Sequence, residues 1–196
     1  MDFKIIFAIL SSVIGIIAFL PYLYDIFKGK TRPHAYTWLL WAITQTIAFA
    51  GIVHGGGGIG ALGLGIGTVL VISVFIISLR FGTRNITFSD KVFLVSGILA
   101  LLVWLILDSP IAAVILVSAI DLIGYAPSFR KSFNNPWSET TKTWFIFVVA
   151  NIFAILAMQN YNLLTLLYIV TISTANFSLA VFCLIRRKQI KTPSQI

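Results

Sequence analysis

Acidic side chains are scarce in this sequence, and charge of either sign is rare. Asp and Glu account for 6 of its 196 residues, and all charged residues together make up 10%. Ordinary soluble domains are about a quarter charged. Apolar residues reach 59%, with a mean hydropathy of +0.99. This composition excludes a soluble globular domain and indicates a helical membrane protein with several spans.

Cysteine is almost absent. The one cysteine, Cys183, excludes an internal disulfide and a cysteine-based metal site. The two histidines, His34 and His54, flank one apolar segment, so we expect them at opposite faces of the membrane, where they cannot share a metal ion. The sequence shows no paired nucleophile and base. We therefore predict no enzymatic activity, no metal and no cofactor.

Seven apolar segments are separated by short polar clusters. Each segment is long enough to cross a bilayer as a helix with some tilt. The first resembles a signal peptide, but no small-residue cleavage site follows it, so we expect it to be retained. The seven predicted transmembrane helices cover residues 3–27, 36–53, 59–80, 91–107, 110–130, 143–159 and 162–185.

Basic residues lie in alternate connections between these segments. Every Lys and Arg except Lys4 falls around the first, third or fifth connection or in the C-terminal tail. The positive-inside rule then places the N-terminus outside and the C-terminus in the cytoplasm of an inner (cytoplasmic) membrane. The net charge of +8 is thus a topology signal. We expect the lipid bilayer as a partner and no nucleic acid, and a homo-oligomer is compatible with the sequence.

The stretch FLPYLYDIFKGKTRPHAYTWLLW joins the first two apolar segments, and its pattern occurs a second time. An ungapped shift of 106 residues places Pro21 on Pro127 and Trp38 on Trp144. The same shift pairs further identical residues, among them Ser12 with Ser118, Phe27 with Phe133, Thr37 with Thr143, Ala48 with Ala154, Thr68 with Thr174 and Arg80 with Arg186. Because these different residue types keep one register, we predict an internal repeat.

Each repeat holds three segments, and the fourth segment lies between the repeats. The second triplet therefore enters the membrane in the same direction as the first. We predict an all-α membrane protein of seven transmembrane helices, with two parallel three-helix bundles joined by a linker helix, an arrangement known from transporters. The expected units are a first bundle at 1–86, a linker helix at 87–108, a second bundle at 109–186 and a cytoplasmic tail at 187–196.

This pattern resembles the PQ-loop superfamily, which includes the SWEET sugar facilitators and the cystinosin-type amino-acid exporters. The family's Pro-Gln is Pro21-Tyr22 in the first copy and Pro127-Ser128 in the second, so the motif is partial. The stretch PYLYDIFKGKTRPH is also similar to a group of small bacterial membrane proteins of unassigned function. The resemblance implies a transporter that moves a small polar solute, of the sugar or amino-acid class, by alternating access.

Two prolines near the ends of predicted helices are candidate hinges. Proline removes a backbone hydrogen bond from a helix and allows a bend. The matched positions of Pro21 and Pro127 favour a hinge in each repeat. A kink in a packed helix is the alternative.

Asp121 is the main candidate for a functional residue, because a carboxyl group inside an apolar segment is costly and usually marks a site. Its counterpart in the first repeat is Gly15, so one repeat alone carries the charge. Apolar surroundings disfavour a charged carboxylate, which makes Asp121 a candidate for proton coupling. A neutral Asp that bonds a neighbouring helix, or an uncoupled facilitator, is also compatible with the sequence.

Amide and tryptophan side chains complete the predicted solute site. Asn176 follows Ala175, which resembles the pocket Ala-Asn of SWEET-like proteins. Gln45 and Asn151 are matched by the repeat and lie near mid-segment, so we expect them at equivalent depth. Amides also serve as hydrogen-bonding contacts between helices. Trp41 is the remaining candidate for contact with the solute.

Two other functions stay open. The pattern W-x-x-W-x-x-x-Q of Trp38, Trp41 and Gln45 resembles that of vitamin transporters that take up nicotinamide riboside on a related fold, where the tryptophans line the pocket. A membrane receptor that binds a ligand without transport is the second alternative. The glycine-rich residues 55–67 do not form a phosphate loop, because no strand precedes them and no Lys-Ser/Thr follows.

Overall fold

The computed structural model of the chain describes residues 3–29, 33–82, 87–134, 136–139 and 141–190. These residues form helices and short connections and contain no β-strand, so the predicted all-α fold is confirmed for the described part of the chain. The elements are α1 (Phe3–Phe27), α2 (Ala35–His54), the 3-10 turn η1 (Gly58–Ala61), α3 (Leu62–Phe81), α4 (Phe88–Leu107), α5 (Pro110–Gly124), α6 (Ala126–Asn134), the 3-10 turn η2 (Pro136–Ser138), α7 (Thr141–Ala157) and α8 (Leu163–Gln189).

Four of these helices are long and apolar enough to cross a membrane, which indicates a membrane protein. They cover Phe3–Tyr24, Ala35–His54, Gly58–Phe81 and Leu163–Gln189. Three further apolar helices, Lys91–Leu107, Pro110–Gly124 and Thr141–Ala157, are shorter, at 10 to 17 residues. All seven coincide with the predicted apolar segments. Backbone polar groups cannot be left unbonded in lipid, which is the physical reason for an all-helical chain.

Two helix ends differ from the sequence prediction. The predicted fifth helix is divided, because α5 ends at Gly124 and α6 begins at Ala126. Pro127 has no N–H with which to continue the hydrogen-bond ladder of α5, and proline is well tolerated in the first turn of a new helix. The last helix continues to Gln189, so the first residues of the expected tail are helical.

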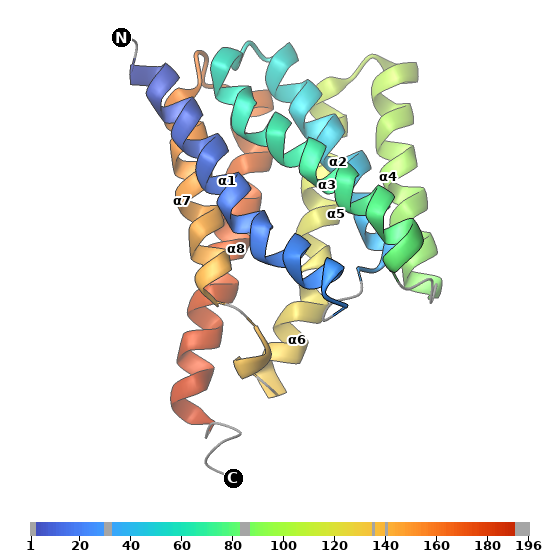
Figure 1. Cartoon of the computed structure of the whole chain (residues 1–196). Helices are drawn as coiled ribbons and strands as arrows, with labels where there is room; N and C mark the ends of the chain where they lie inside the picture. Colours follow the sequence, from blue (N-terminus) through green and yellow to red (C-terminus); the bar gives the residue numbers. More distant parts are fainter. Residues whose placement is uncertain (1–2, 30–32, 83–86, 135, 140, 191–196) are drawn as a thin grey trace.

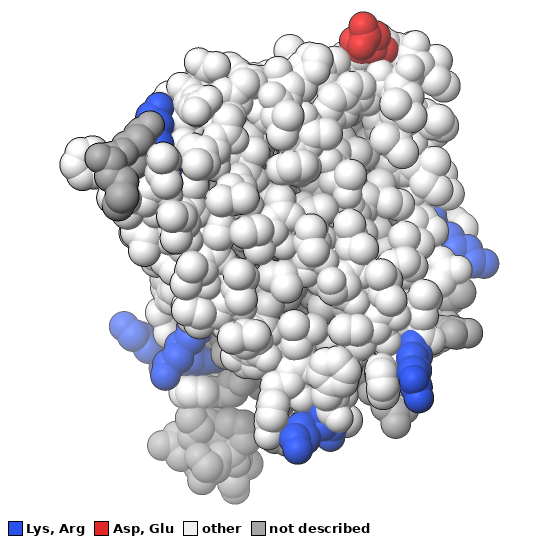
Figure 2. All heavy atoms as spheres, turned by 45° about the horizontal axis from the view of Figure 1, so that its top comes forward, with Lys and Arg blue, Asp and Glu red and all other residues white. Residues whose placement is uncertain are grey.

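The helices run up and down through the molecule (Figure 1), so that their connections gather at two ends. One end holds the N-terminus and the connections 55–57, 108–109 and 158–162, and we call it the neutral end. The other end, the basic end, holds the last turn of α8. In Figure 2, Lys and Arg atoms gather along the lower rim of the face shown, and the middle of that face carries neither basic nor acidic atoms.

Two sets of three helices, α1, α2 and α3 and then α5, α7 and α8, show the same order of contacts, and we call them the first and the second group. In the first group, α3 packs against both α1 and α2. Within the described residues, the backbones of α1 and α2 are not in contact with each other. In the second group, α8 packs against both α5 and α7. The groups meet where α1 packs on α7 and α2 packs on α5, and α4 contacts α2 and α5. Small residues at these contacts, such as the fully buried Ala48 and Ala113, let the helices come close.

At the neutral end, the glycine-rich connection after α2 is docked against the connection between α7 and α8. Asn162 Nδ2 donates to the carbonyl of Gly55 at 2.7 Å, and Asn160 Nδ2 donates to that of Gly56 at 3.1 Å. The backbone N–H of Gln159 donates to the carbonyl of Gly57 at 3.0 Å. The two groups of helices are therefore hydrogen-bonded to each other at this end.

This docking requires glycine at particular positions. Gly56 has a φ of +73°, in the left-handed region that favours glycine. A Cβ on Gly60 would lie 2.6 Å from Cα of Met158 and 2.7 Å from its backbone nitrogen. Backbone atoms cannot move aside as the end of a flexible side chain can. Lys4, the basic residue expected on this side, donates from Nζ to the carbonyl of Met158 at 2.8 Å.

At the basic end, two arginines of α8 hold the chain that leads into α7. Arg187 donates to the carbonyls of Pro136 and Glu139 at 3.1 and 2.6 Å, and its guanidinium lies 4.8 Å from the Trp137 ring centroid. Arg186 donates to the carbonyl of Phe133. The part of α8 that extends beyond its apolar segment therefore carries the arginines that bond the chain before α7.

We predict that Gly60→Ala destabilises the protein, because the added methyl group meets the backbone of Met158. Overpacking of this kind costs about 1–3 kcal/mol. Gly15→Ala on α1 is the matched control, since a Cβ there meets nothing within 4 Å and alanine is the better helix former. Thermal unfolding in detergent should show a lower midpoint for Gly60→Ala alone. Equal midpoints for the two variants would contradict the docking.

Candidate functional site

Asp121 lies on the last turn of α5 and is the centre of a buried polar cluster. Its side chain is 6% exposed. Tyr168 Oη on α8 donates to Asp121 Oδ2 at 2.5 Å, and Thr44 Oγ1 on α2 lies 3.4 Å from the same oxygen. Thr44 Oγ1 is also 3.3 Å from the carbonyl of Trp41, so its hydroxyl can donate to either acceptor. The carboxyl group therefore joins three helices.

A second hydrogen bond extends the cluster toward the basic end. Tyr125 stands four residues after Asp121, one helical turn further on. Its Oη donates to Asn176 Oδ1 on α8 at 2.5 Å, and its ring lies 6.0 Å from that of Trp144 at an interplanar angle of 55°. We call Thr44, Asp121, Tyr125, Tyr168 and Asn176 the carboxyl cluster.

Two buried acceptors, one on α5 and one on α2, have no hydrogen-bond partner among the described residues. They are Asp121 Oδ1 and Gln45 Oε1, and both atoms are buried. Gln45 follows Thr44 directly in α2. Nor does any described Lys, Arg or His side chain hydrogen-bond to Asp121, whose described partners are Tyr168 and Thr44. A buried acceptor without a donor costs about 1–3 kcal/mol, so this region is suited to a molecule that supplies donors.

The structure brings together two of the predicted solute contacts and leaves three elsewhere. Asp121 and Asn176 both belong to the carboxyl cluster. Gln45 faces α3, where its Oε1 lies 3.9 Å from the position of a Cβ on Gly67. Asn151 is half-buried on α7 and makes no described hydrogen bond to the cluster.

Trp41, the remaining candidate, belongs to an aromatic cluster of Phe19, Tyr22, Trp38, Trp41 and Phe147. The Trp38 and Trp41 rings meet edge to face at 5.1 Å, and Trp38 is only 7% exposed. The ring centroid of Phe19 lies 5.8 Å from that of Phe147 on α7 and 6.3 Å from that of Trp38 on α2. This aromatic cluster joins α1, α2 and α7 in the half of the molecule nearer the basic end.

The two candidate hinges differ in their surroundings. Pro21 lies inside α1, which is helical on both sides of it. Pro127 is the second residue of α6, just after the break at Tyr125. In this conformation the helix is continuous through Pro21 but is interrupted just before Pro127.

Sequence reasoning missed Thr44, Tyr125 and Tyr168. Tyr125 could have been found, because a residue four positions after a buried carboxyl group shares its helix face. Thr44 and Tyr168 carry no such signal. A threonine or tyrosine in an apolar helix commonly bonds its own backbone or reaches the membrane interface, and the contact with Asp121 depends on how α2 and α8 are placed.

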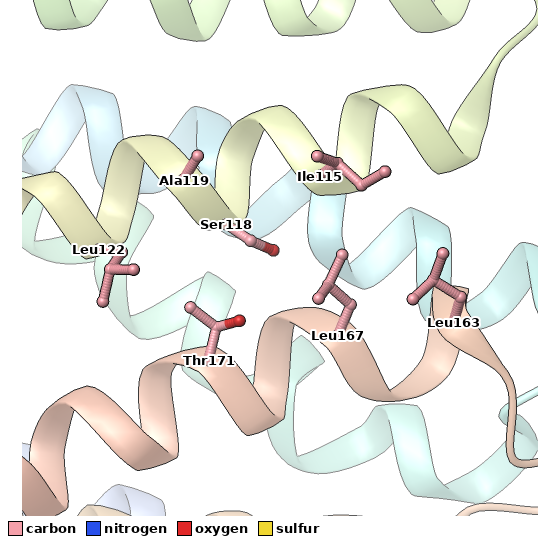
Figure 3. A pocket seen from close by; sticks show the side chains of 7 residues that line it. All are labelled: Ile115, Ser118, Ala119, Leu122, Leu163, Leu167 and Thr171. Atoms are coloured by element: carbon pink, nitrogen blue, oxygen red, sulfur yellow. The ribbon is translucent and has the colours of Figure 1, made fainter.

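Two grooves on the outer surface of the bundle are apolar, and neither is lined by a residue of the carboxyl cluster. One groove of about 390 Å³ lies between α5 and α8 (Figure 3). Its lining residues are Ile115, Ser118, Ala119, Leu122, Leu163, Leu167 and Thr171. Ser118 Oγ already donates to the carbonyl of Val114 at 2.7 Å. Asp121 does not line this groove, because its carboxyl group is directed toward Thr44 and Tyr168.

Comparison of the chain with protein-family models, with curated proteins and with solved structures gives no match. The interpretation of the site therefore rests on its own geometry and chemistry.

We predict that the Tyr168–Asp121 hydrogen bond contributes to stability. Tyr168→Phe removes the donor to Oδ2 and should lower the free energy of unfolding by about 1 kcal/mol, the usual range for bonds between membrane helices. Combined with Asp121→Leu, which removes the acceptor, the two changes should not be additive. Tyr161→Phe, at an exposed tyrosine, is the matched control. Denaturation in mixed micelles gives all four values, and additive effects would show that the bond contributes nothing.

Proposed function

We propose that this protein is a transporter that moves a small polar solute across the membrane by alternating access. The observation that carries the proposal is the carboxyl cluster. It is a buried carboxyl group with an unbonded oxygen, enclosed by apolar helices, at the contact between the two helix groups. A purely structural core at this place would be apolar, because each buried polar group costs free energy unless it is fully bonded.

The packing of the helices supports two repeats of three helices. If α1, α2 and α3 correspond to α5, α7 and α8, then each contact within one group has its equivalent in the other. The contacts between the groups also occur in equivalent pairs. The contact of α1 with α7 is equivalent to that of α5 with α2, and the contact of α3 with α7 is equivalent to that of α8 with α2. Equivalent pairs of this kind are expected for two repeats related by a twofold axis along the membrane normal.

Individual side chains support the same correspondence. Under the 106-residue shift, Phe19 and Trp38 become Tyr125 and Trp144. The first ring pair is separated by 6.3 Å at 61°, and the second by 6.0 Å at 55°. Likewise Ser12 Oγ donates to the carbonyl of Ala8 at 2.8 Å, and its counterpart Ser118 donates to that of Val114 at 2.7 Å.

These correspondences favour seven membrane spans with α4 as the linker helix. The three shorter apolar helices would then cross the bilayer with the help of their flanking turns. The partial Pro-Gln motif and this arrangement together support a relation to the PQ-loop and SWEET-like transporters.

Alternating access would take place by opening one end at a time. The docked connections at the neutral end support an exit closed on that side in this conformation. Nearer the basic end, the contact between Phe19 and Phe147 links α1 to α7, while α6 packs on α8 of its own group. Opening toward the basic end would part the aromatic cluster, and Pro21 and Pro127 are the proposed hinges.

Asp121 is the proposed group for coupling to protons. A carboxyl group can bind a proton from one side of the membrane and release it to the other when the accessible end changes. Tyr168 and Thr44 both contact Oδ2, which leaves Oδ1 for the exchange with water or solute.

Uptake by the purified protein in liposomes tests this function. We expect the protein to carry at least one labelled sugar, amino acid or amine faster than protein-free liposomes do, and an imposed pH gradient to alter the rate. Asp121→Asn keeps the shape of the neutral acid but cannot titrate, so its uptake should no longer follow the gradient. Asp108→Asn is the control, because it makes the same change at an exposed residue of the neutral end.

Two outcomes would contradict the proposal in different ways. Saturable solute binding without any flux would favour a receptor over a transporter. Uptake by Asp121→Asn that still follows the pH gradient would remove Asp121 from proton coupling but leave transport in place.

The proposed orientation puts the neutral end outside the cell. Tyr161 is exposed at that end, and Lys142 is exposed at the start of α7 on the basic side. In a Cys183→Ala background, Tyr161→Cys should react with a membrane-impermeant thiol reagent added to intact cells, and Lys142→Cys should react only after lysis. The reverse labelling pattern would overturn the orientation.

A further inference from the structure

Asp121 is the one acidic residue of the carboxyl cluster, and the cluster contains no basic residue. Within the described chain, Asp121 is bonded by two hydroxyl groups and by no basic side chain. The sequences of α2, α5 and the apolar part of α8 contain no Lys or Arg. Removing a carboxylate from water is costly unless a positive partner accompanies it.

The unbonded oxygen of Asp121 defines what a bound molecule must supply. Asp121 Oδ1 is buried without a donor, whereas the other unbonded acceptor, Gln45 Oε1, faces α3. A molecule with an N–H donor would satisfy Oδ1, and hydrogen bonds from a charged donor to a carboxylate are about twice as strong as those between neutral groups. An anion would find no basic partner among the described side chains of this cluster.

Two tyrosines belong to the carboxyl cluster itself. Tyr168 bonds Asp121 directly, and Tyr125 is one turn away with Trp144 at 6.0 Å from its ring. Aromatic faces attract cations through the negative potential above the ring.

We infer that the solute taken by this site is a protonated amine, whose ammonium group bonds Asp121 Oδ1 and whose charge balances the carboxylate. The inference rests on the proposed function, because it names the class of solute that the transporter carries. Neutral sugars supply hydroxyl donors but no charge, and acidic solutes repel the carboxylate, so the site discriminates against both.

Binding to the purified protein tests the solute class separately from transport. The probes are ethanolamine and putrescine, each compared with the diol of the same carbon skeleton, ethylene glycol and 1,4-butanediol. Isothermal titration calorimetry should show at least about tenfold tighter binding of one amine than of its diol, the ratio expected for a charge-assisted hydrogen bond. Asp121→Asn should remove this preference, and Asp108→Asn, with the same change at an exposed residue, should retain it.

The results separate the solute class from the function. The inference is overturned if neither amine binds, if the diols bind as tightly, or if Asp121→Asn keeps the preference. The comparison of amine and diol uses the unaltered protein, so it holds even if a variant folds poorly. An amine that binds but never enters liposomes would overturn transport and leave the solute class. Transport of a neutral or acidic solute, without any binding of the amines, would overturn the solute class and leave transport in place.

Discussion

A carboxyl group can stay buried among apolar helices only where other helices bring it hydrogen-bond donors, and in this protein Asp121 imposes that condition on α2 and α8. The hydroxyl of Tyr168 and that of Thr44 both reach Oδ2, so α5 is bonded to one helix of its own group and to one of the other. This contact lies where the two groups meet. Any movement of the groups relative to each other must break or rearrange it, and for that reason the proposed solute site and the proposed motion are linked at one residue.

The neutral end is held by a different kind of contact. There the bonds join backbone carbonyls of glycines to the side-chain amides of Asn160 and Asn162. Because glycine lacks a Cβ, the backbone of Met158 can lie directly against Gly60. A glycine-rich segment that resembles a phosphate loop in composition thus acts as a surface for close backbone contact. Such bonds are short-range and can be exchanged for bonds to water, which is compatible with the proposed opening of this end.

Much of the fold could be predicted from the sequence, because helix positions in an apolar chain follow directly from hydropathy and from proline. The predicted segments agree with the helices to within a few residues. The exceptions are the break at Tyr125 and the extension of α8 to Gln189. The break depends on Pro127, which was visible but was placed inside a helix. The extension depends on Arg186 and Arg187 reaching carbonyls of residues about fifty positions away, and such contacts have no local signal.

In the candidate site, too, some features could be predicted from the sequence and others depend on tertiary contacts. The sequence by itself determined that Asp121 lies within an apolar segment, and it indicated Asn176 on the last helix. It could not determine that Tyr168 and Thr44 bond Asp121, that Tyr125 bonds Asn176, or that Gln45 faces α3. Those facts depend on the rotation and separation of helices distant in sequence. Hydropathy fixes which residues are in the apolar layer, but it is nearly the same on all sides of these helices, so the choice of neighbours is decided by tertiary packing and by the few donors that a buried carboxyl group requires.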